Sequence, residues 1–438
     1  MPTRVLIVGG GGREHALAWK LAAEPGVNAI LVAPGSAGIA EEPRTRRLQD
    51  VDPLDRGAIV AAARAHAVEL VIVGPEAPLA AGVADALRSA GVAVFGPDRQ
   101  AARIETSKAF CRDVATAAGV RIAHGRAFRA DEADAARAFV AQLGAGGNGL
   151  VLKQDGLAAG KGVNLYEDVA LALEHVPSFL AGDTGRVPRL VVEERLRGRE
   201  ASVIAICDGR DALALPAARD HKRLCDGDDG PNTGGMGAYS PLPDLDDEAV
   251  ERIVDAVHRP ILAELARRRT AFVGFLYAGL MLTADGPVLL ECNARLGDPE
   301  AQVILPRLAG PIGPILLAAA RGMLPLELPR RVPVVPGATV GVVLAAKGYP
   351  GTPKRGAPIE GIEAARAGGA LVFHAGTVGR PGGGFGTNGG RVLTVVGRGV
   401  DLAAARDSAE RAAEQISWDG LQRRHDIGAE PTLVGAAQ

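Results

Sequence analysis

The sequence predicts an α/β protein built from more than one domain, and three patterns support this fold class. Over residues 1–103, short apolar strands alternate with alanine-rich helices. Strand–loop–strand patterns follow in the middle of the chain, and the last part is rich in strand signals. At roughly 100–200 residues per domain, a chain of 438 residues has room for about two to four domains.

The first part of the chain predicts a parallel sheet with helices on both faces. Continuous apolar strands alternating with helices are typical of such a sheet. The expected strands cover residues 5–8, 27–32, 69–73 and 92–95, and the expected helices cover 13–23, 57–67 and 77–90. Each strand is followed by a glycine-bearing turn. These turns would line the carboxyl edge of the sheet, where open α/β sheets bind ligands.

The remaining elements follow from the same kind of pattern. A helix is expected over residues 101–118, then strands at 149–153, 163–166 and 190–194, with a loop at 154–162. A long polar loop (219–239), a helix (247–268) and a hairpin (274–283 with 287–293) come next. A proline-rich linker (324–336) precedes strands at 339–345, 370–374 and 391–396 and a closing helix at 403–416.

Composition excludes several classes of protein. A formal net charge of −2 and an aromatic content of 3% argue against a nucleic-acid partner. No apolar run reaches the roughly 18 residues of a membrane-spanning helix, and the N-terminus has no signal-peptide pattern. The cysteines at 111, 207, 225 and 292 are scattered, as expected for free thiols in a reducing compartment. We therefore expect a cytoplasmic protein without membrane or nucleic-acid partners.

The first glycine-rich motif, at residues 9–12, lies between an expected strand and an expected helix. Such a turn suits phosphate, because helix N-terminal amides point at the ligand. A dinucleotide fits poorly, since Glu14 stands where glycine or alanine is needed and the second strand lacks an acidic end. A sugar phosphate paired with Arg13 is the better interpretation, and a purely structural tight turn remains open.

The second motif, residues 150–163, carries two of the seven lysines, Lys153 and Lys161. A glycine loop between antiparallel strands can close over a triphosphate, and Lys153 can neutralise phosphate oxygens as a point charge. No GxxxxGK[ST] sequence is present, so this is not a Walker loop. A surface hairpin without a ligand remains the alternative.

The third motif, residues 190–196, is an apolar strand followed by a polar turn, and Glu200 lies beyond it. Backbone groups at residues 193–196 could meet an adenine edge, and Glu200 could accept from ribose hydroxyls. Taken alone, this segment also reads as an ordinary strand end.

The fourth motif places Glu291 and Asn293 two residues apart on a strand, so both side chains face the same way. Two oxygen ligands on one face suit a hard cation such as Mg²⁺, with phosphate and water completing its shell. Arg295 follows, and its planar fork suits a carboxylate or a phosphate. Solvated polar residues at a strand end are the alternative reading.

The fifth motif is the glycine-rich loop of residues 219–239, which mixes aspartates with basic residues. It can be read as a substrate loop that places Lys222, Arg223 and backbone amides around an anion. A disordered charged loop is the alternative.

Together these segments resemble the phosphoribosylamine–glycine ligases, or glycinamide ribonucleotide synthetases, of the ATP-grasp superfamily. The matching stretches run in order along the whole chain: GGREHALAWK (11–20), VGPEAPLAAG (73–82), FGP (95–97), SKAF (107–110), DGLAAGKGV (155–163), DHKR (220–223), DGDDGPNTGGMGAYSP (226–241), YAGLM (277–281), GDPEAQ (297–302), FHAGT (373–377) and TNGGRVL (387–393). Small departures occur at Asp98, Gln154 and in ECNAR (291–295), and none removes an expected ligand.

The resemblance implies three domains: a Rossmann-like N-terminal domain (1–103), an ATP-grasp α+β core (104–325) with a mobile lid at about 120–192, and a small β-rich C-terminal domain (326–438). It also implies an ATP site, a site for Mg²⁺ or Mn²⁺, and a substrate site. The ATP residues would be Lys108, Lys153, Gly156, Gly160, Lys161, Gly162, Glu193, Glu194, Leu196 and Glu200, and the metal ligands Glu291 and Asn293. The substrate residues would be Gly11, Gly12, Arg13, Glu14, Gly35, Asp220, Lys222, Arg223, Asn232, Thr233, Gly234, Gly235, Arg295, Gly297 and Asp298.

The implied activity is the ATP-dependent ligation of glycine to 5-phosphoribosylamine through glycyl phosphate, by an enzyme expected to act as a monomer. Another ATP-grasp carboxylate–amine ligase, such as a biotin-carboxylase relative, is the alternative within the enzymes. A nucleotide-binding regulatory protein and an NAD enzyme are alternatives from other classes, and both fit the motifs less well.

Overall fold

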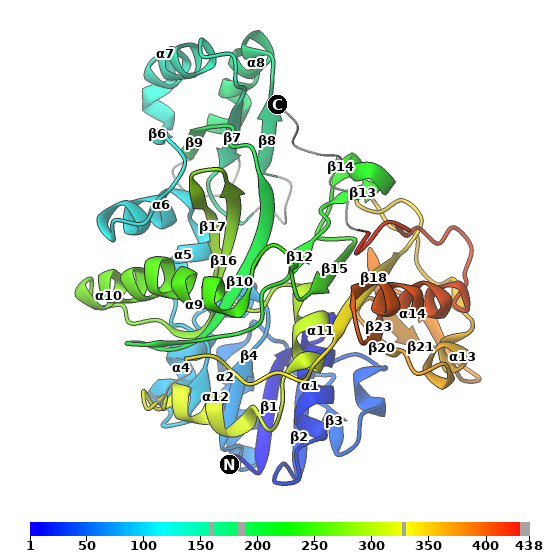
Figure 1. Ribbon diagram of the computed structural model, residues 1–438. Coiled ribbons are helices and arrows are strands. Elements are labelled where there is room, and N and C mark those ends of the chain that lie inside the picture. The colour runs from blue at the N-terminus through cyan, green and yellow to red at the C-terminus, as the bar shows by residue number, and fades with distance from the viewer. Residues whose placement is uncertain (158–161, 182–188, 326–329, 430–438) are drawn as a thin grey trace.

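The computed structural model describes residues 1–157, 162–181, 189–325 and 330–429. Figure 1 shows a parallel sheet near the N-terminus, a central sheet, an outer sheet at the top of the view, and a further β-rich part beside them. Within the described residues, no helix is long and apolar enough to cross a membrane. The mixed α/β class expected from the sequence is confirmed.

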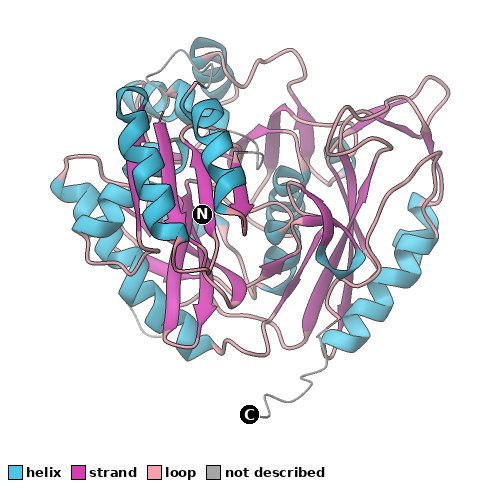
Figure 2. Cartoon of the chain, turned by 90° about the horizontal axis from the view of Figure 1, so that it is seen from above, coloured by secondary structure: helices cyan, strands magenta, loops and turns pink. Residues whose placement is uncertain are grey.

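The N-terminal sheet is parallel and has the strand order β3-β2-β1-β4-β5. Its strands are β1 (Arg4–Gly9), β2 (Ala29–Pro34), β3 (Thr45–Arg47), β4 (Leu70–Val73) and β5 (Val94–Phe95), joined by α1 (Gly12–Ala22), η1 (Ile39–Glu41), α2 (Arg56–Ala65), α3 (Glu76–Ala81) and α4 (Val83–Ser89). Alternate residues of β1 belong to two different hydrophobic clusters, because helices cover both faces (Figure 2).

Two elements of this part differ from expectation. The edge strand β3 was not expected, because its sequence Thr-Arg-Arg has no apolar residue and it forms only by pairing with β2. The single helix expected over 77–90 is two helices, because Gly82 adopts a left-handed conformation (φ 85°) that interrupts them.

The central part is built on an antiparallel sheet with the order β11-β10-β16-β17, here called the core sheet. It comprises β10 (Arg199–Asp208), β11 (Ala212–Ala214), β16 (Val273–Thr283) and β17 (Gly286–Asn293). Around it lie α5 (Arg103–Thr106), α6 (Lys108–Ala117), α9 (Asp247–Ile253), the π-helix η4 (Val254–His258), α10 (Arg259–Arg267), α11 (Glu300–Ile304), η5 (Leu305–Arg307) and α12 (Gly313–Ala320). The helix expected over 101–118 breaks at Ser107, whose φ of −142° is extended.

The outer sheet has the order β6-β9-β7-β8 and is antiparallel throughout. It comprises β6 (Gly125–Arg129), β7 (Leu150–Gln154), β8 (Val163–Tyr166) and β9 (Arg189–Glu194), preceded by η2 (Ala130–Glu132) and covered by α7 (Ala133–Gly144) and α8 (Val169–Leu180). Phe128, Leu152 and Val176 belong to a hydrophobic cluster separate from those beneath the other sheets. The outer sheet therefore has a core of its own.

The β-rich part contains the sheet β12-β15-β18-β23-β20 and the small sheet β19-β22-β21. Their C-terminal strands are β18 (Ala338–Ala345), β19 (Pro358–Ile359), β20 (Leu371–His374), β21 (Thr377–Gly379), β22 (Phe385–Thr387) and β23 (Arg391–Gly399), with α13 (Ile362–Ala367) between them. The closing helix α14 (Leu402–Glu414) packs on β23 and β18.

Residues 219–239 were expected to be a loop, but the segment 219–240 contains four strands. β12 (Arg219–Asp220) and β15 (Gly237–Ser240) extend the C-terminal sheet, because β15 pairs with β18. Between them, β13 (Arg223–Cys225), η3 (Asp226–Asp228) and β14 (Asp229–Asn232) form a hairpin. The expectation of a loop is therefore wrong for much of this segment, which lies between the core sheet and the C-terminal part (Figure 1).

Candidate functional site

The two N-terminal glycine turns touch each other at the carboxyl edge of the parallel sheet. A Cβ added to Gly10 would lie 2.9 Å from the carbonyl oxygen of Gly35, so a side chain there is excluded. Gly12 opens α1, and a Cβ on it would lie 2.4 Å from Gln302 Nε2. The N-terminus of α1 therefore packs directly against the segment that carries Asp298, to which Gln302 donates a 2.8 Å hydrogen bond.

The side chain of Glu14 caps the N-terminus of α1 and is buried. Its Oε2 accepts a 2.6 Å hydrogen bond from the Gly11 amide, and the residue is 2% exposed. Burial raises the pKa of Glu14, while Arg13 opposes the rise. Arg13 Nε lies 3.8 Å from the Asp298 carboxylate. The amide of Gly11 is thus already bonded within the turn, and Arg13 is the group of this turn that reaches the neighbouring loop.

Lys153, at the end of β7 in the outer sheet, reaches the core sheet. Its Nζ lies 2.6 Å from Glu193 Oε2 and donates a 2.9 Å hydrogen bond to the carbonyl oxygen of Leu290. Leu290 has no partner in the β16–β17 register, because Gly279 pairs with Glu291 and Leu280 pairs with Leu289. This irregularity leaves the Leu290 carbonyl available to Lys153.

The beginning of the glycine loop is anchored on α6. Lys108 Nζ donates a 2.9 Å hydrogen bond to the carbonyl oxygen of Gly156. The carboxylate of Asp155 accepts hydrogen bonds from the Ser107 hydroxyl and the Ala109 amide, both at 3.0 Å. Burial lowers the pKa of Lys108, although Glu291 opposes the shift. Gly160 and Lys161 lie outside the described residues, and the Gly162 carbonyl closes the base of the hairpin on the Gln154 amide at 2.7 Å.

Glu291 and Asn293 both lie on β17 and are half-buried. Neither side chain forms a hydrogen bond within the described residues. Burial would raise the pKa of Glu291, but Lys222, Lys153 and Lys108 together lower it. An ionised carboxylate and an amide oxygen with free lone pairs fit a hard divalent cation.

The described residues contain no group of three or more His, Cys, Asp or Glu side chains arranged to hold a metal. A cation at Glu291 and Asn293 would therefore need oxygens of a bound phosphate and of water to complete its coordination.

The two acidic residues at the end of β9 have partners of their own. Glu193 also pairs with Arg112 at 3.1 Å, and Glu194 Oε1 accepts a 2.7 Å hydrogen bond from the His124 amide. Leu196 is half-buried just beyond the strand. Glu200 is the second residue of β10 and pairs through Oε2 with Lys222 at 2.9 Å. Glu193 therefore holds both Lys153 and Arg112, while Glu200 holds Lys222.

The 219–240 segment brings several predicted substrate residues beside Glu291. Burial raises the pKa of Asp220. Burial would lower the pKa of Lys222, but Asp220, Glu200 and Glu291 hold it well above its ordinary value. Arg223 instead donates to the Gly230 carbonyl at 2.7 Å, so it stabilises the β13–β14 hairpin.

Residues 232–235 of the same segment, here called the tip, are held by hydrogen bonds and by close packing. Asn232 ends β14, and the Thr233 hydroxyl donates to the Lys222 carbonyl at 2.9 Å and accepts from the Gly235 amide at 3.0 Å. A Cβ on Gly235 would lie 2.6 Å from Pro299 Cδ. The tip therefore packs on the turn that follows Gly297 and Asp298.

Arg295 is held in place by two glutamates that sequence reasoning missed. Its guanidinium lies 2.8 Å from Glu105 and 3.4 Å from Glu76. Burial opposes the charge, but the two carboxylates raise the pKa of Arg295 further above its ordinary value. Glu76 lies within the matched stretch 73–82 and Glu105 lies just before the stretch 107–110, which was the only signal in the sequence.

Gly297 is required by a close approach, since a Cβ on it would lie 2.3 Å from Glu300 Oε2. The Asp298 carboxylate lies 3.5 Å from Arg391, another residue that sequence reasoning missed. Burial would raise the pKa of Asp298, but Arg391 and Arg13 lower it. Side chains from the N-terminal, central and C-terminal parts thus meet around Asp298.

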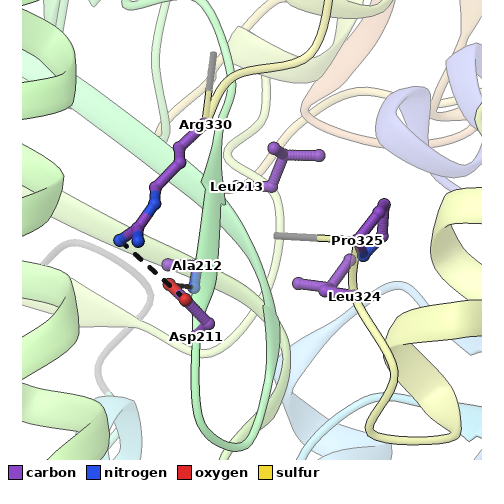
Figure 3. Close-up of a pocket in the computed structure, with 6 residues that line it drawn as sticks. All are labelled: Asp211, Ala212, Leu213, Leu324, Pro325 and Arg330. Carbon is purple, nitrogen blue, oxygen red and sulfur yellow. Dashed lines mark hydrogen bonds and ion pairs between the residues drawn. The ribbon is translucent and has the colours of Figure 1, made fainter. Parts of the chain in front are cut away.

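A further cavity is lined by none of the residues of this arrangement. It has a volume of about 10 Å³ and is lined by Asp211, Ala212, Leu213, Leu324, Pro325 and Arg330, with Asp211 and Arg330 paired at 4.0 Å (Figure 3). Such a space holds about one water molecule. It is too small for a nucleotide or a sugar phosphate.

Comparison with known proteins assigns the chain to a family. Three family profiles match it in order: the N domain of phosphoribosylglycinamide synthetase at residues 3–105, its ATP-grasp (A) domain at 106–301 and its C domain at 339–430. The chain is 48% identical to the phosphoribosylamine–glycine ligase of Streptomyces coelicolor, covering 98% of this chain and 99% of the relative. It is 46% identical to that of Leifsonia xyli, covering 97% and 99%.

Solved structures agree with the sequence relatives. The crystal structure of phosphoribosylamine–glycine ligase from Thermotoga maritima matches with a TM-score of 0.79 and 32% identity, covering 97% of this chain and 99% of that one. A biotin carboxylase domain from Hydrogenobacter thermophilus matches with a TM-score of 0.71 at 16% identity, over 97% and 92% of the two chains. That second likeness concerns the fold alone. The chain therefore belongs to the phosphoribosylamine–glycine ligase family, whose ATP-grasp enzymes make glycinamide ribonucleotide from glycine and 5-phosphoribosylamine in purine biosynthesis.

Proposed function

We propose that the ligation proceeds through glycyl phosphate at the junction of the outer and core sheets. The observation that carries this proposal is the hydrogen bond from Lys153 to the Leu290 carbonyl, which brings a buried cation beside Glu291. Lys108 and Lys222 contribute to the same electrostatic environment. Phosphoryl transfer depends mainly on positioning and on neutralising phosphate charge, and this cluster of charges is suited to both.

In the proposed reaction, a carboxylate oxygen of glycine attacks the γ-phosphorus of ATP and ADP leaves. The amine of phosphoribosylamine then attacks the acyl carbon of glycyl phosphate. Inorganic phosphate departs with the former carboxylate oxygen, and the nitrogen loses a proton. Closure of the outer sheet would exclude water from the acyl phosphate, which would otherwise hydrolyse.

We assign the ATP site to Lys108, Lys153, Gly156, Gly160, Lys161, Gly162, Glu193, Glu194, Leu196 and Glu200. Lys153 and Lys108 would face the phosphates. Glu200 has one carboxylate oxygen, Oε1, with no partner among the described residues, and this oxygen could accept from a ribose hydroxyl. Glu291 and Asn293 would hold Mg²⁺ or Mn²⁺, which would neutralise phosphate charge when bound. The related biotin carboxylase structure from Hydrogenobacter thermophilus is described as a complex with MgADP.

We assign the substrate site to the junction around Asp298. Arg295 would pair with a carboxylate or a phosphate. Arg13 and the glycine turns at Gly11, Gly12 and Gly35 would face the sugar phosphate, and the buried Glu14 would hold the first of these turns. The 219–240 segment would supply Asp220, Lys222 and the backbone of Asn232–Gly235, with Arg223 supporting its hairpin. Gly297 and Asp298 would complete the wall opposite the segment.

We further propose the domain division 1–103, 104–325 and 326–438, with a lid at about 120–192, in a cytoplasmic monomer. Sedimentation or light scattering of the purified protein at micromolar concentration tests the monomer. A mass near twice the 44.9 kDa of the chain would refute it.

An isotope experiment tests the chemistry directly. Glycine labelled with ¹⁸O in its carboxylate is converted with ATP and phosphoribosylamine, and the inorganic phosphate is analysed by mass spectrometry. The glycyl phosphate route transfers one labelled oxygen to each phosphate released. Unlabelled phosphate from a reaction that still forms the amide would rule that route out. Omitting glycine is the matched control, and ADP formation should then be lost.

A further inference from the structure

Arg391, the first residue of β23, joins two loops that belong to other parts of the chain. Its NH1 nitrogen donates to the carbonyl oxygen of Gly234 at 2.6 Å and also to the carbonyl oxygen of Asp298. The same nitrogen lies 3.5 Å from the Asp298 carboxylate. Burial would lower the pKa of Arg391, but Asp298 and Tyr349 raise it, so Arg391 remains a cation. Hydrogen bonds from a cation are about twice as strong as neutral ones.

The peptide groups of Gly234 are held from the C-terminal part on both sides. The Gly234 amide donates a 2.8 Å hydrogen bond to the Tyr349 hydroxyl, while its carbonyl accepts from Arg391. The Tyr349 ring in turn packs against Gly390, where an added Cβ would lie 2.4 Å from Tyr349 Cδ2. Tyr349 and Arg391 therefore form one clamp on the tip of the 219–240 segment.

The clamp also fixes the distance between that tip and Asp298. Asp298 is held by Gln302 at 2.8 Å and lies 3.8 Å from Arg13, so its position is set by the N-terminal and central parts. Arg391 contacts Asp298 directly from the C-terminal sheet, and Thr394 on the same strand lies 3.5 Å from Gln302. Its guanidinium does not contact Lys108, Lys153, Glu291 or Asn293 within the described residues.

We propose that Arg391 is a positioning residue for the glycine and phosphoribosylamine site, and that it acts by clamping the tip at Gly234 against the turn at Asp298. This inference rests on the proposed substrate role of the 219–240 segment. All these contacts come from one guanidinium nitrogen, so a lysine ammonium should restore them in part, and its flexible stem should keep the restoration incomplete. The loss should therefore fall on substrate binding and leave ATP binding intact.

The test measures KM for glycine, phosphoribosylamine and ATP, together with kcat, in Arg391→Ala, Arg391→Lys and Tyr349→Phe. In Arg391→Ala we expect KM for glycine or phosphoribosylamine to rise about 10- to 100-fold, the factor for losing a charge-assisted bond, while KM for ATP changes less than about 2-fold. Arg391→Lys should lie between the alanine variant and the wild type. Guanidinium ion added to Arg391→Ala should lower the raised KM, which a merely structural role would not explain.

Arg398→Ala is the matched control, because Arg398 lies on the same strand and is exposed. It should leave all three KM values and kcat unchanged. Tyr349→Phe removes only one hydroxyl, so it keeps the test decisive if Arg391→Ala does not fold, and it should raise the same KM by a smaller factor. An equal rise in all three KM values without guanidinium rescue, or no change in any of them, would overturn the proposal.

Two variants of the 219–240 segment separate this inference from the assignment on which it rests. If Asn232→Ala and Lys222→Met also leave the KM values for glycine and phosphoribosylamine unchanged, the 219–240 segment is not the substrate site, and both proposals fail. If these two variants raise one of those KM values but Arg391→Ala and Tyr349→Phe do not, only the clamp is refuted.

Discussion

The ammonium of Lys153 donates a 2.9 Å hydrogen bond to the main-chain oxygen of Leu290, the residue directly before Glu291. The two residues are 137 positions apart and belong to different sheets. The bond places the basic strand end and the expected metal ligand beside the same space. If these two groups lay on separate surfaces, they could not bind the same triphosphate. In the structure they lie close together.

Replacing Lys153 with methionine should raise KM for ATP about tenfold or more and leave KM for glycine nearly unchanged. The side chain is 10% exposed, and methionine preserves its approximate volume while removing the charge. Glu193 keeps Arg112 as a partner, which limits the loss of stability. ATP titration at saturating glycine measures the effect. Lys354→Ala, at an exposed lysine, is the control, and an unaltered ATP titration in Lys153→Met would contradict the phosphate role.

Replacing Glu291 with glutamine should lower kcat roughly 100-fold and shift activity to higher Mg²⁺ or Mn²⁺ concentrations, because a charged oxygen ligand is lost. Titration of activity against each metal measures the shift. Glu248→Gln changes a glutamate whose side chain is 85% exposed and should behave as the wild type. A Glu291→Gln enzyme with normal rate and metal dependence would show that the assignment is wrong.

Two glycines of the 219–240 segment should respond differently to alanine. Both have positive φ, 110° at Gly235 and 70° at Gly227, so each change costs about 1 kcal/mol of backbone strain. Only at Gly235 does the new Cβ meet Pro299, while Gly227 has nothing within 4 Å. Gly235→Ala should therefore raise KM for glycine or phosphoribosylamine, and Gly227→Ala should lower only the melting temperature. Equal kinetics in the two variants would count against the contact with Pro299.

His258 should make stability depend on pH. Burial lowers its pKa from an ordinary value of 6.5 to about 4, and its Nε2 lies 3.3 Å from the Val203 carbonyl. The unfolded chain therefore takes up the proton first, and stability is lost as pH falls from 6.5 towards 4. At pH 5 the loss is about 2 kcal/mol.

Denaturant unfolding at pH 7 and pH 5 measures this loss. His258→Gln keeps an amide donor but does not titrate, so its stability should change less between the two pH values. His66→Gln, at the end of α2, is the matched control and should retain the dependence of the wild type. An equal pH dependence in His258→Gln and the wild type would show that another group is responsible.

Sequence patterns predicted the elements whose residues determine them locally. The apolar strands β1, β2 and β4 and the helices α1 and α2 were expected within a few residues of their observed bounds. β3 was missed because Thr45–Arg47 gains strand structure only from pairing with β2. β12 and β15 were missed for the same reason, since β15 pairs with β18 about a hundred residues further along the chain.

In the candidate site, too, some residues are marked by local sequence signals and others are brought in only by the fold. Glycine loops, a lysine at a strand end and a two-residue spacing are local signals, and they led to Lys153, Glu291 and Asn293. Glu76 and Arg391 carry no such local signal, because each is a single charged residue marked only by lying within a matched stretch, 73–82 or 387–393. Their significance comes from partners such as Arg295, 219 positions from Glu76, which only the fold brings close. The roles of all these residues remain predictions.

The pairing of β15 with β18 also limits how the gene can be divided. A fragment ending before β18 would leave β15 with unpaired backbone groups along one edge, and the C-terminal fragment would lack two strands of its sheet. Exposed edges of this kind favour aggregation. Separate expression of the two pieces should therefore give poorly soluble products, whereas co-expression would allow the sheet to form across the break.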